Sequence, residues 1–240
     1  MGTSATRAAI VVMVAVAASA SCHGGGEKSA APTTASPHGG RSGSASATPA
    51  SASPRYTARQ LAGALIKPPA GAAAISKGSG PYETVIKKLS GGAPQATGNP
   101  SCDAMGRTGI DVTGSMPSAF VSFAQVGRSP SEVLVAVPDP VAEQAVTQPV
   151  PQACRTIKAR AAGTTVTATV VSDEPLHIGD GGRIIRTDQV TGGTRLRSWQ
   201  VFFTGPGYLA NIDVTGTNVT RADAETLARQ AQRRASTTLR

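Results

Sequence analysis

Aromatic residues are scarce in this chain of 240 residues, where Phe, Trp and Tyr together make up 3%. Proteins that bind single-stranded nucleic acid stack bases on aromatic side chains, so this class of function is disfavoured. Histidine and cysteine are also rare, at three residues each. None of them has the spacing of a zinc site, and no H-E-x-x-H motif is present. We therefore expect no nucleic-acid partner, no metal and no other cofactor.

The chain also lacks an apolar run of about 20 residues, the length that a membrane-spanning helix needs. Its longest run, "AAIVVMVAVAASASC", follows Arg7 and ends in small side chains. This layout is typical of an export signal, which we place at 1–21. The small residues before Cys22 resemble the lipobox of bacterial lipoproteins, although Ser19 replaces its usual large aliphatic residue. We expect lipidated Cys22 to anchor the protein to the outer face of the cell membrane; with an ordinary signal cut nearby, the protein would be secreted.

Residues 22–55 have the composition of a tether. The segment after Cys22 is nearly all Gly, Ser, Ala, Thr and Pro, which supplies too little apolar surface to offset the entropy of ordering. A disordered tether of this length has a root-mean-square span of about 30 Å. His23 and His38 lie in it, and we interpret them as solvated linker residues.

Residues 56–240 are long enough for one domain with its own core and too short for two. They contain two cysteines, Cys102 and Cys154. An even pair in an exported chain is normally a disulfide, and this one would close a loop of about 50 residues. A catalytic or metal-binding role is disfavoured because neither cysteine has a histidine or a second ligand nearby, and a redox-active pair because the C-x-x-C spacing is absent.

Hydrophobic periodicity predicts an α+β domain. The predicted helices are 56–66, 82–89, a short one around Cys102, 129–146 with interruptions at Pro138 and Pro140, and a terminal helix capped by Thr220 and Asp223. The predicted strands are 118–126, 164–171, 182–190, 195–203 and 207–216. Short Gly-rich turns join antiparallel neighbours, so we expect an antiparallel sheet packed against helices, with one internal disulfide and the C-terminal helix on the sheet.

A family resemblance covers nearly the whole body. Its landmarks are "NPSCDAM", "AFVSFAQ", "EVLVAVPDPVAEQAV", "IGDGGRIIRT", "WQVFFTGPGYLANIDVTG" and "ADAETLARQAQRRA". Their order resembles actinobacterial extracytoplasmic lipoproteins related to the PknH-type sensor domain. The resemblance implies an antiparallel sheet flanked by helices around a cleft, and a sensor-like domain that binds ligands without catalysis. Kinase-linked members carry two disulfides, whereas this body can form one, and we find no kinase or spanning helix in the sequence. We therefore do not expect the chain alone to signal across the membrane.

A catalytic site has one formal set of candidates. His177 is the sole histidine of the body, with Asp173, Asp180 and Asp188 near it in sequence. No G-x-S-x-G elbow accompanies them, so we expect no catalytic residue and interpret Asp180, between glycines, as a turn residue. Trp199 lies in a predicted strand, where it is either a core residue or a platform at the edge of a cleft.

Positive charge predominates, with a net charge of +9. Two functions remain open. The first is a lipid-anchored ligand-binding or sensing module whose cleft takes a small envelope molecule. The second is a non-catalytic scaffold whose basic surface binds an acidic protein or an anionic wall polymer, although the arginines also fit a solvated surface without a partner. The residues do not identify the ligand-binding positions.

Overall fold

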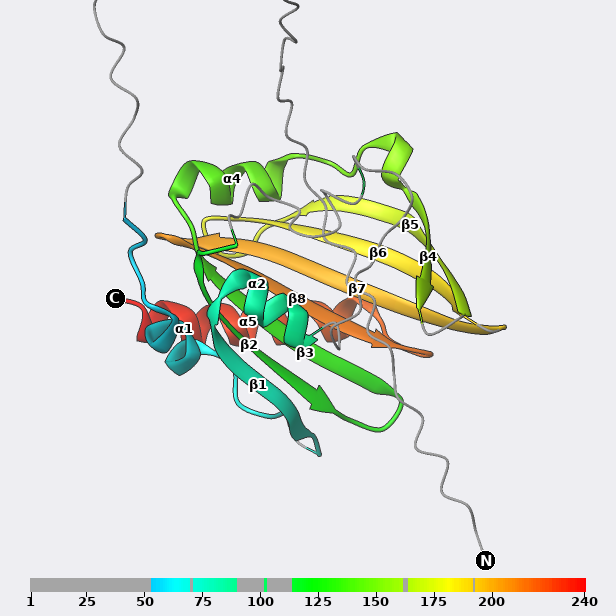
Figure 1. The fold of residues 1–240 in the computed structure, drawn as a ribbon, viewed down its shortest axis with the longest axis horizontal. Helices are drawn as coiled ribbons and strands as arrows, with labels where there is room; N and C mark the ends of the chain where they lie inside the picture. The colour runs from blue at the N-terminus through cyan, green and yellow to red at the C-terminus, as the bar shows by residue number, and fades with distance from the viewer. Residues whose placement is uncertain (1–52, 70, 90–101, 103–113, 162–163, 192) are drawn as a thin grey trace, which may run out of the picture.

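The computed structural model describes residues 53–69, 71–89, 102, 114–161, 164–191 and 193–240 (Figure 1). The predicted signal, Cys22, the two histidines of the predicted tether and the surroundings of Cys102 lie outside these residues. Within them, no helix is both long and apolar enough to cross a membrane.

Eight antiparallel strands form one sheet in the order β1-β2-β3-β8-β7-β6-β5-β4. The strands are β1 (Ala73–Pro81), β2 (Pro117–Ala124), β3 (Arg128–Ala136), β4 (Thr156–Ala161), β5 (Thr164–Leu176), β6 (Gly181–Thr191), β7 (Thr194–Gly205) and β8 (Tyr208–Gly216). The helices of the described residues are α1 (Ala58–Ala64), α2 (Tyr82–Leu89), α4 (Asp139–Thr147), the 3-10 helix η1 (Gln152–Cys154) and α5 (Arg221–Thr238). The predicted α+β class, with an antiparallel sheet and a C-terminal helix on it, is confirmed.

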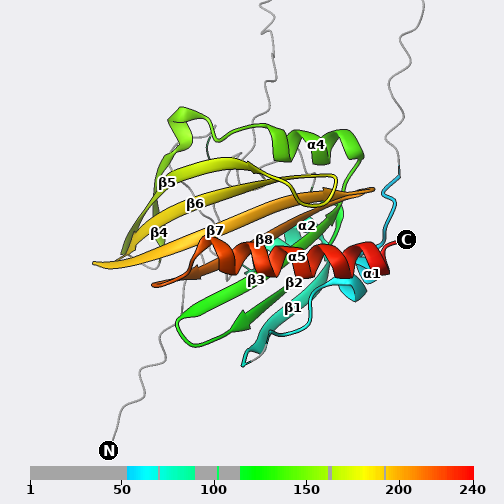
Figure 2. The ribbon, with the colours of Figure 1, turned by 180° about the vertical axis from the view of Figure 1, so that it is seen from behind.

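Helices cover both faces of the sheet, and each face has its own apolar core. On one face, α5 lies against β7 and β8 while α1 lies against β1 and β2 (Figure 2). Its core combines the apolar stripe of α5 with strand residues such as Phe203 and Ile212. On the other face, α2 lies against β1 and β2 and α4 lies against β6, β7 and β8 (Figure 1), with Phe120, Val133 and Phe202 in the core of that face. We call these the α1/α5 face and the α2/α4 face.

One predicted helix is wrong in part. Its first part lies in strand β3 (Arg128–Ala136), whereas the segment after Pro138 is helix α4, as predicted. Strand β3 lies inside the sheet and is buried on both faces from Pro130 onward, so its sequence is a continuous run without the alternation that identifies a half-exposed strand. Such a run cannot be told from a buried helix by periodicity. Strands β1 and β4 were not predicted; β1 is mostly exposed and contains two glycines.

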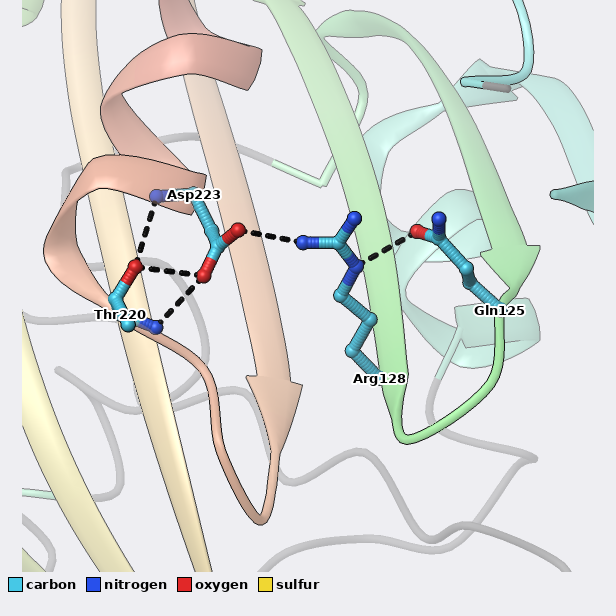
Figure 3. A network of polar contacts seen from close by, with 4 residues as sticks. All are labelled: Gln125, Arg128, Thr220 and Asp223. Atoms are coloured by element: carbon cyan, nitrogen blue, oxygen red, sulfur yellow. Dashed lines mark hydrogen bonds and ion pairs between the residues drawn. The ribbon is translucent and has the colours of Figure 1, made fainter. Parts of the chain in front are cut away.

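A polar network fixes the beginning of α5 (Figure 3). Thr220 and Asp223 form the predicted capping box, in which each side chain accepts a hydrogen bond from the other residue's backbone N–H. The second carboxylate oxygen of Asp223 lies 2.6 Å from the guanidinium of Arg128 on β3, whose Nε donates to Gln125. These hydrogen bonds from Thr220, together with Arg128, lower the pKa of Asp223. The network ties the first turn of the helix to the turn between β2 and β3.

The predicted disulfide between Cys102 and Cys154 is present, and its two cysteines are 52 residues apart in the sequence. Both cysteines are buried in the core of the α2/α4 face. The bond therefore links η1 covalently to Cys102 within that core.

Candidate functional site

Two adjacent rows of buried polar side chains cross the α2/α4 face at the centre of the sheet. Strand pairing places Ser131, Asp213 and Gln200 side by side on β3, β8 and β7. The next row contains Thr215, Ser198 and Thr187 on β8, β7 and β6. All six are at most 7% exposed. Because side chains alternate between faces, they project to the same side as the core residues Val133 and Phe202. We call these six residues and the adjoining Asn211 the polar rows.

Several atoms in the polar rows have no hydrogen-bond partner among the described residues. They are Ser131 Oγ, Thr187 Oγ1, Gln200 Oε1 and Asn211 Oδ1. Leaving a buried polar atom unpaired costs about 1–3 kcal/mol, so native proteins pair nearly all of them. Four such atoms on one stretch of sheet need hydrogen-bond partners from beyond the described residues, and bound water or a ligand is one source of them.

Asp213 is the ionisable residue of the polar rows. Its carboxylate accepts hydrogen bonds from Ser198 Oγ at 2.5 Å and from Thr215 Oγ1 at 3.1 Å and 3.2 Å. Burial raises its pKa to about 6, and the two hydroxyl donors oppose that rise. The carboxyl group therefore changes its charge near neutral pH, which is where functional carboxyls are often tuned.

A buried ion pair holds the neighbouring part of the same face. Arg183 on β6 and Asp173 on β5 form a bidentate pair, and both side chains are 4% exposed. Arg183 also donates to the carbonyl of Gln148, and Asp173 accepts from the N–H of Val150 at 2.8 Å. The pair has a structural role, because it links β5 to β6 and its further hydrogen bonds fasten Gln148 and Val150, after α4, to the sheet.

A pocket of about 420 Å³ lies on the opposite face, between the turn that joins β5 to β6 and helix α5. Its polar lining consists of His177 and Asp180 from the turn and of Arg229, Gln232 and Arg233 from the helix. His177 and Asp180 are both exposed. The structure thus gives two of the sequence-predicted candidates a shared pocket with two arginines.

The formal Ser/His/Asp arrangement is not assembled. Asp173 is engaged by Arg183, and Asp188 pairs with Arg186 and Arg197. Asp180 alone among the three carboxylates shares the pocket of His177, and the described residues that line this pocket include no serine. The described part of the chain also contains no cluster of three or more metal-ligating side chains.

Trp199 lies on β7 and packs partly buried against the core of the α1/α5 face. Its indole N–H has no hydrogen-bond partner among the described residues. The prediction that it is a core residue is closer to the structure than a platform for a ligand, because it packs against this core and does not line the pocket on the same face.

Sequence reasoning missed the polar rows. The available signal was Asp213 inside the apolar strand "YLANIDVTG" and Gln200 inside "SWQVFF", where an acid or an amide interrupts a buried run. The strand order places β3, β8, β7 and β6 side by side, and the sequence of a single strand does not predict that order.

Comparison with known proteins supports the fold assignment. No protein-family model and no curated protein match the sequence. The crystal structure of the extracellular domain of PknH from Mycobacterium tuberculosis matches with a TM-score of 0.50 and 8% identity over 77% of this chain and 98% of that domain. The X-ray structure of an uncharacterized protein (Rv0999 ortholog) from Mycobacterium smegmatis reaches a TM-score of 0.39 and 12% identity over 70% and 88%. The chain thus has a fold similar to that of the PknH extracellular domain, as its sequence resemblance predicts.

Proposed function

We propose that this protein is an extracytoplasmic module, anchored to the outer face of the cell membrane through lipid on Cys22, that binds a small polar molecule of the envelope at the polar rows. The observation that carries the proposal is the set of buried polar atoms without partners on Ser131, Thr187, Gln200 and Asn211. A ligand that pairs these atoms would stabilise the folded protein, and the stabilisation would grow with the logarithm of its concentration above Kd.

The chemistry of the polar rows defines the ligand class. The unpaired atoms of Gln200 and Asn211 are amide oxygens, which only accept hydrogen bonds. Ionised Asp213 also only accepts. The ligand should therefore present several donors, such as hydroxyl or amine groups. The flanking side chains Phe202 and Val133 would contact an apolar part of the same molecule.

A binding role without catalysis agrees with the separation of the candidate catalytic residues, since two of the three aspartates are held in ion pairs away from His177. It also agrees with the fold of the neighbour, which is an extracellular domain of a larger protein. A scaffold that binds an anionic polymer or acidic protein is the alternative.

Native mass spectrometry of the protein after exposure to envelope extract tests the binding proposal. We expect a small-molecule adduct on the wild type that is lost in Gln200→Leu, because leucine fills the space without accepting hydrogen bonds. Gln152→Leu, which changes an exposed glutamine on η1, is the matched control and should keep the adduct. Absence of any adduct, together with salt-sensitive capture of an anionic polymer, would favour the scaffold.

The anchor is tested separately by fractionation of cells that produce the wild type or Cys22→Ser. We expect the wild type in the membrane fraction and the variant released from it. Equal release of both proteins would remove the lipid anchor from the proposal and leave the ligand site unaffected.

A further inference from the structure

The pocket on the α1/α5 face contains two arginines whose positive charge the protein's own acidic groups neutralise only in part. Arg233 has no acidic partner within the described residues, and the guanidinium of Arg229 is 3.8 Å from Glu225 at its nearest. Glu225 is already engaged by the Nε of Arg221 at 2.6 Å. Arg229 and Arg233 are four residues apart on one helix, a spacing at which like charges repel each other. An anion between them would remove this repulsion.

The other wall of the pocket is a rigid turn. Gly179 has a φ of +62°, and a Cβ at this position would collide with the carbonyl oxygen of Thr204. The next backbone N–H, that of Asp180, donates to the same carbonyl oxygen at 3.1 Å. The backbone of Gly179 and Asp180 is thus fixed to β7, so this wall of the pocket is formed before any ligand arrives.

The pocket therefore has two chemically different ends. Two guanidinium groups supply planar arrays of donors that match the oxygens of a phosphate, and they offer more donors than a single carboxylate can accept. Asp180 would repel a phosphate, but its carboxylate accepts hydrogen bonds from hydroxyl groups. Leu176 and Ile178, whose side chains are buried, contribute the apolar part of the lining. A volume of about 420 Å³ lies in the range of small-molecule sites.

We propose that this pocket binds a phosphorylated polyol, with the phosphate between Arg229 and Arg233 and its hydroxyl groups on Asp180. Gln232 and His177 supply further hydrogen bonds to the same molecule. The shared chemistry fits both a soluble polyol phosphate and the headgroup of a phospholipid. The site lies on the opposite face from the polar rows, so this proposal can be tested independently of the function proposed above.

Isothermal titration calorimetry with glycerol 3-phosphate tests this proposal, with inorganic phosphate and glycerol as partial probes. We expect saturable binding of glycerol 3-phosphate, weaker binding of phosphate and none of glycerol. Arg233→Gln should lower the affinity for glycerol 3-phosphate by about tenfold or more, because it removes a charge-assisted hydrogen bond. The charge-matched control is Arg195→Gln, an exposed arginine on β7 outside the pocket lining, which should change the affinity by less than about twofold.

Two further measurements complete the test. Asp180→Asn should reduce the preference for glycerol 3-phosphate over phosphate, because the amide is a poorer acceptor for hydroxyl groups than the carboxylate. Cosedimentation with phosphatidylglycerol vesicles that is lost in Arg233→Gln would assign the phosphate to a lipid, and binding of the soluble ligand alone would assign it to a metabolite. Equal weakening by Arg195→Gln, or no saturable binding of glycerol 3-phosphate, would overturn the proposal. Gln200→Leu, in the polar rows, should leave this binding unchanged.

Discussion

Replacing Glu132 by glutamine should stabilise the protein at alkaline pH. Glu132 lies on β3 with no exposed surface, on the α1/α5 face, where its Oε2 accepts from the N–H of Ile66 at 2.6 Å. Its Oε1 has no hydrogen-bond partner among the described residues. Burial raises its pKa to about 7, although the hydrogen bond from Ile66 and the charge of Arg234 both oppose the rise.

The sign and size of the effect follow from this pKa. The folded protein holds the proton up to about pH 7, whereas the unfolded chain releases it near 4.5. Between these values the folded state binds more protons, so the free energy of unfolding decreases as pH rises. A difference of about 2.5 pH units corresponds to a loss of about 3 kcal/mol that is complete above the folded pKa. Glutamine has nearly the shape of the protonated acid and does not titrate in this range.

Urea unfolding of wild type and Glu132→Gln at pH 4, 6 and 8 measures this effect. We expect similar stabilities at pH 4 and an advantage of about 3 kcal/mol for the variant at pH 8. Glu143→Gln, which changes an exposed glutamate on α4, is the matched control and should track the wild type. If Glu132→Gln is the less stable protein at pH 8, the contacts of the ionised carboxylate with Ile66 and Arg234 outweigh its burial, and the reasoning is refuted.

Three other predictions test the structural framework. Cys102→Ser with Cys154→Ser should lower the free energy of unfolding by about 4 kcal/mol in urea titrations, because the bond closes a 52-residue loop; no loss would mean that the bond does not form. Thr220→Ala should cost about 1 kcal/mol, or about 2–4 °C in melting temperature, by removing the cap of α5; an unchanged melting curve would contradict that role. Asp173→Ala should cost about 3–5 kcal/mol because it leaves a buried guanidinium unpaired, whereas Glu174→Ala, which removes an exposed ion pair, should cost less than about 1 kcal/mol; equal losses would argue against a special role for the buried pair.

The sequence predicted those parts of the fold whose patterns are local. The terminal helix combines a cap with apolar residues at helical spacing, and its bounds depend on no other segment. Strands β5 to β8 follow one another through short turns, so their antiparallel pairing could be deduced from chain order. Strand β3 is different, since it pairs with β8 across a long separation in the chain. Because β3 is buried on both faces, its sequence has no alternating pattern, and its continuous apolar run predicts a helix instead.

The candidate sites were less predictable because they depend on that long-range pairing. His177 and Asp180 could be identified from one short segment, but their arginine partners lie on a helix some 50 residues later in the sequence. The polar rows form only when four strands pair in the right register. The pairing of β3 with β8, for example, places Ser131 beside Asp213. An amphipathic pattern within one strand does not reveal which strand lies beside it.

The polar rows also predict a conflict between stability and binding. Thr187 is 1% exposed and its hydroxyl oxygen has no partner among the described residues. Valine has the same shape and needs no hydrogen bond, so Thr187→Val should raise the free energy of unfolding by about 1 kcal/mol or more in urea titrations. If the rows bind a polar ligand, the same variant should bind it less tightly, so stability and affinity would change in opposite directions.

A variant that gains no stability would show that Thr187 already has a partner in the folded protein, such as an ordered water, and that its hydroxyl is not available to a ligand. A variant that gains stability and retains the adduct would place the ligand elsewhere on the sheet. The free energy of unfolding and the ligand adduct, measured on the same variant, therefore distinguish buried polar residues that bind a ligand from buried polar residues that do not. We expect a gain in stability together with loss of the adduct, because a valine at this position satisfies the fold without needing the hydrogen bond that a ligand would supply.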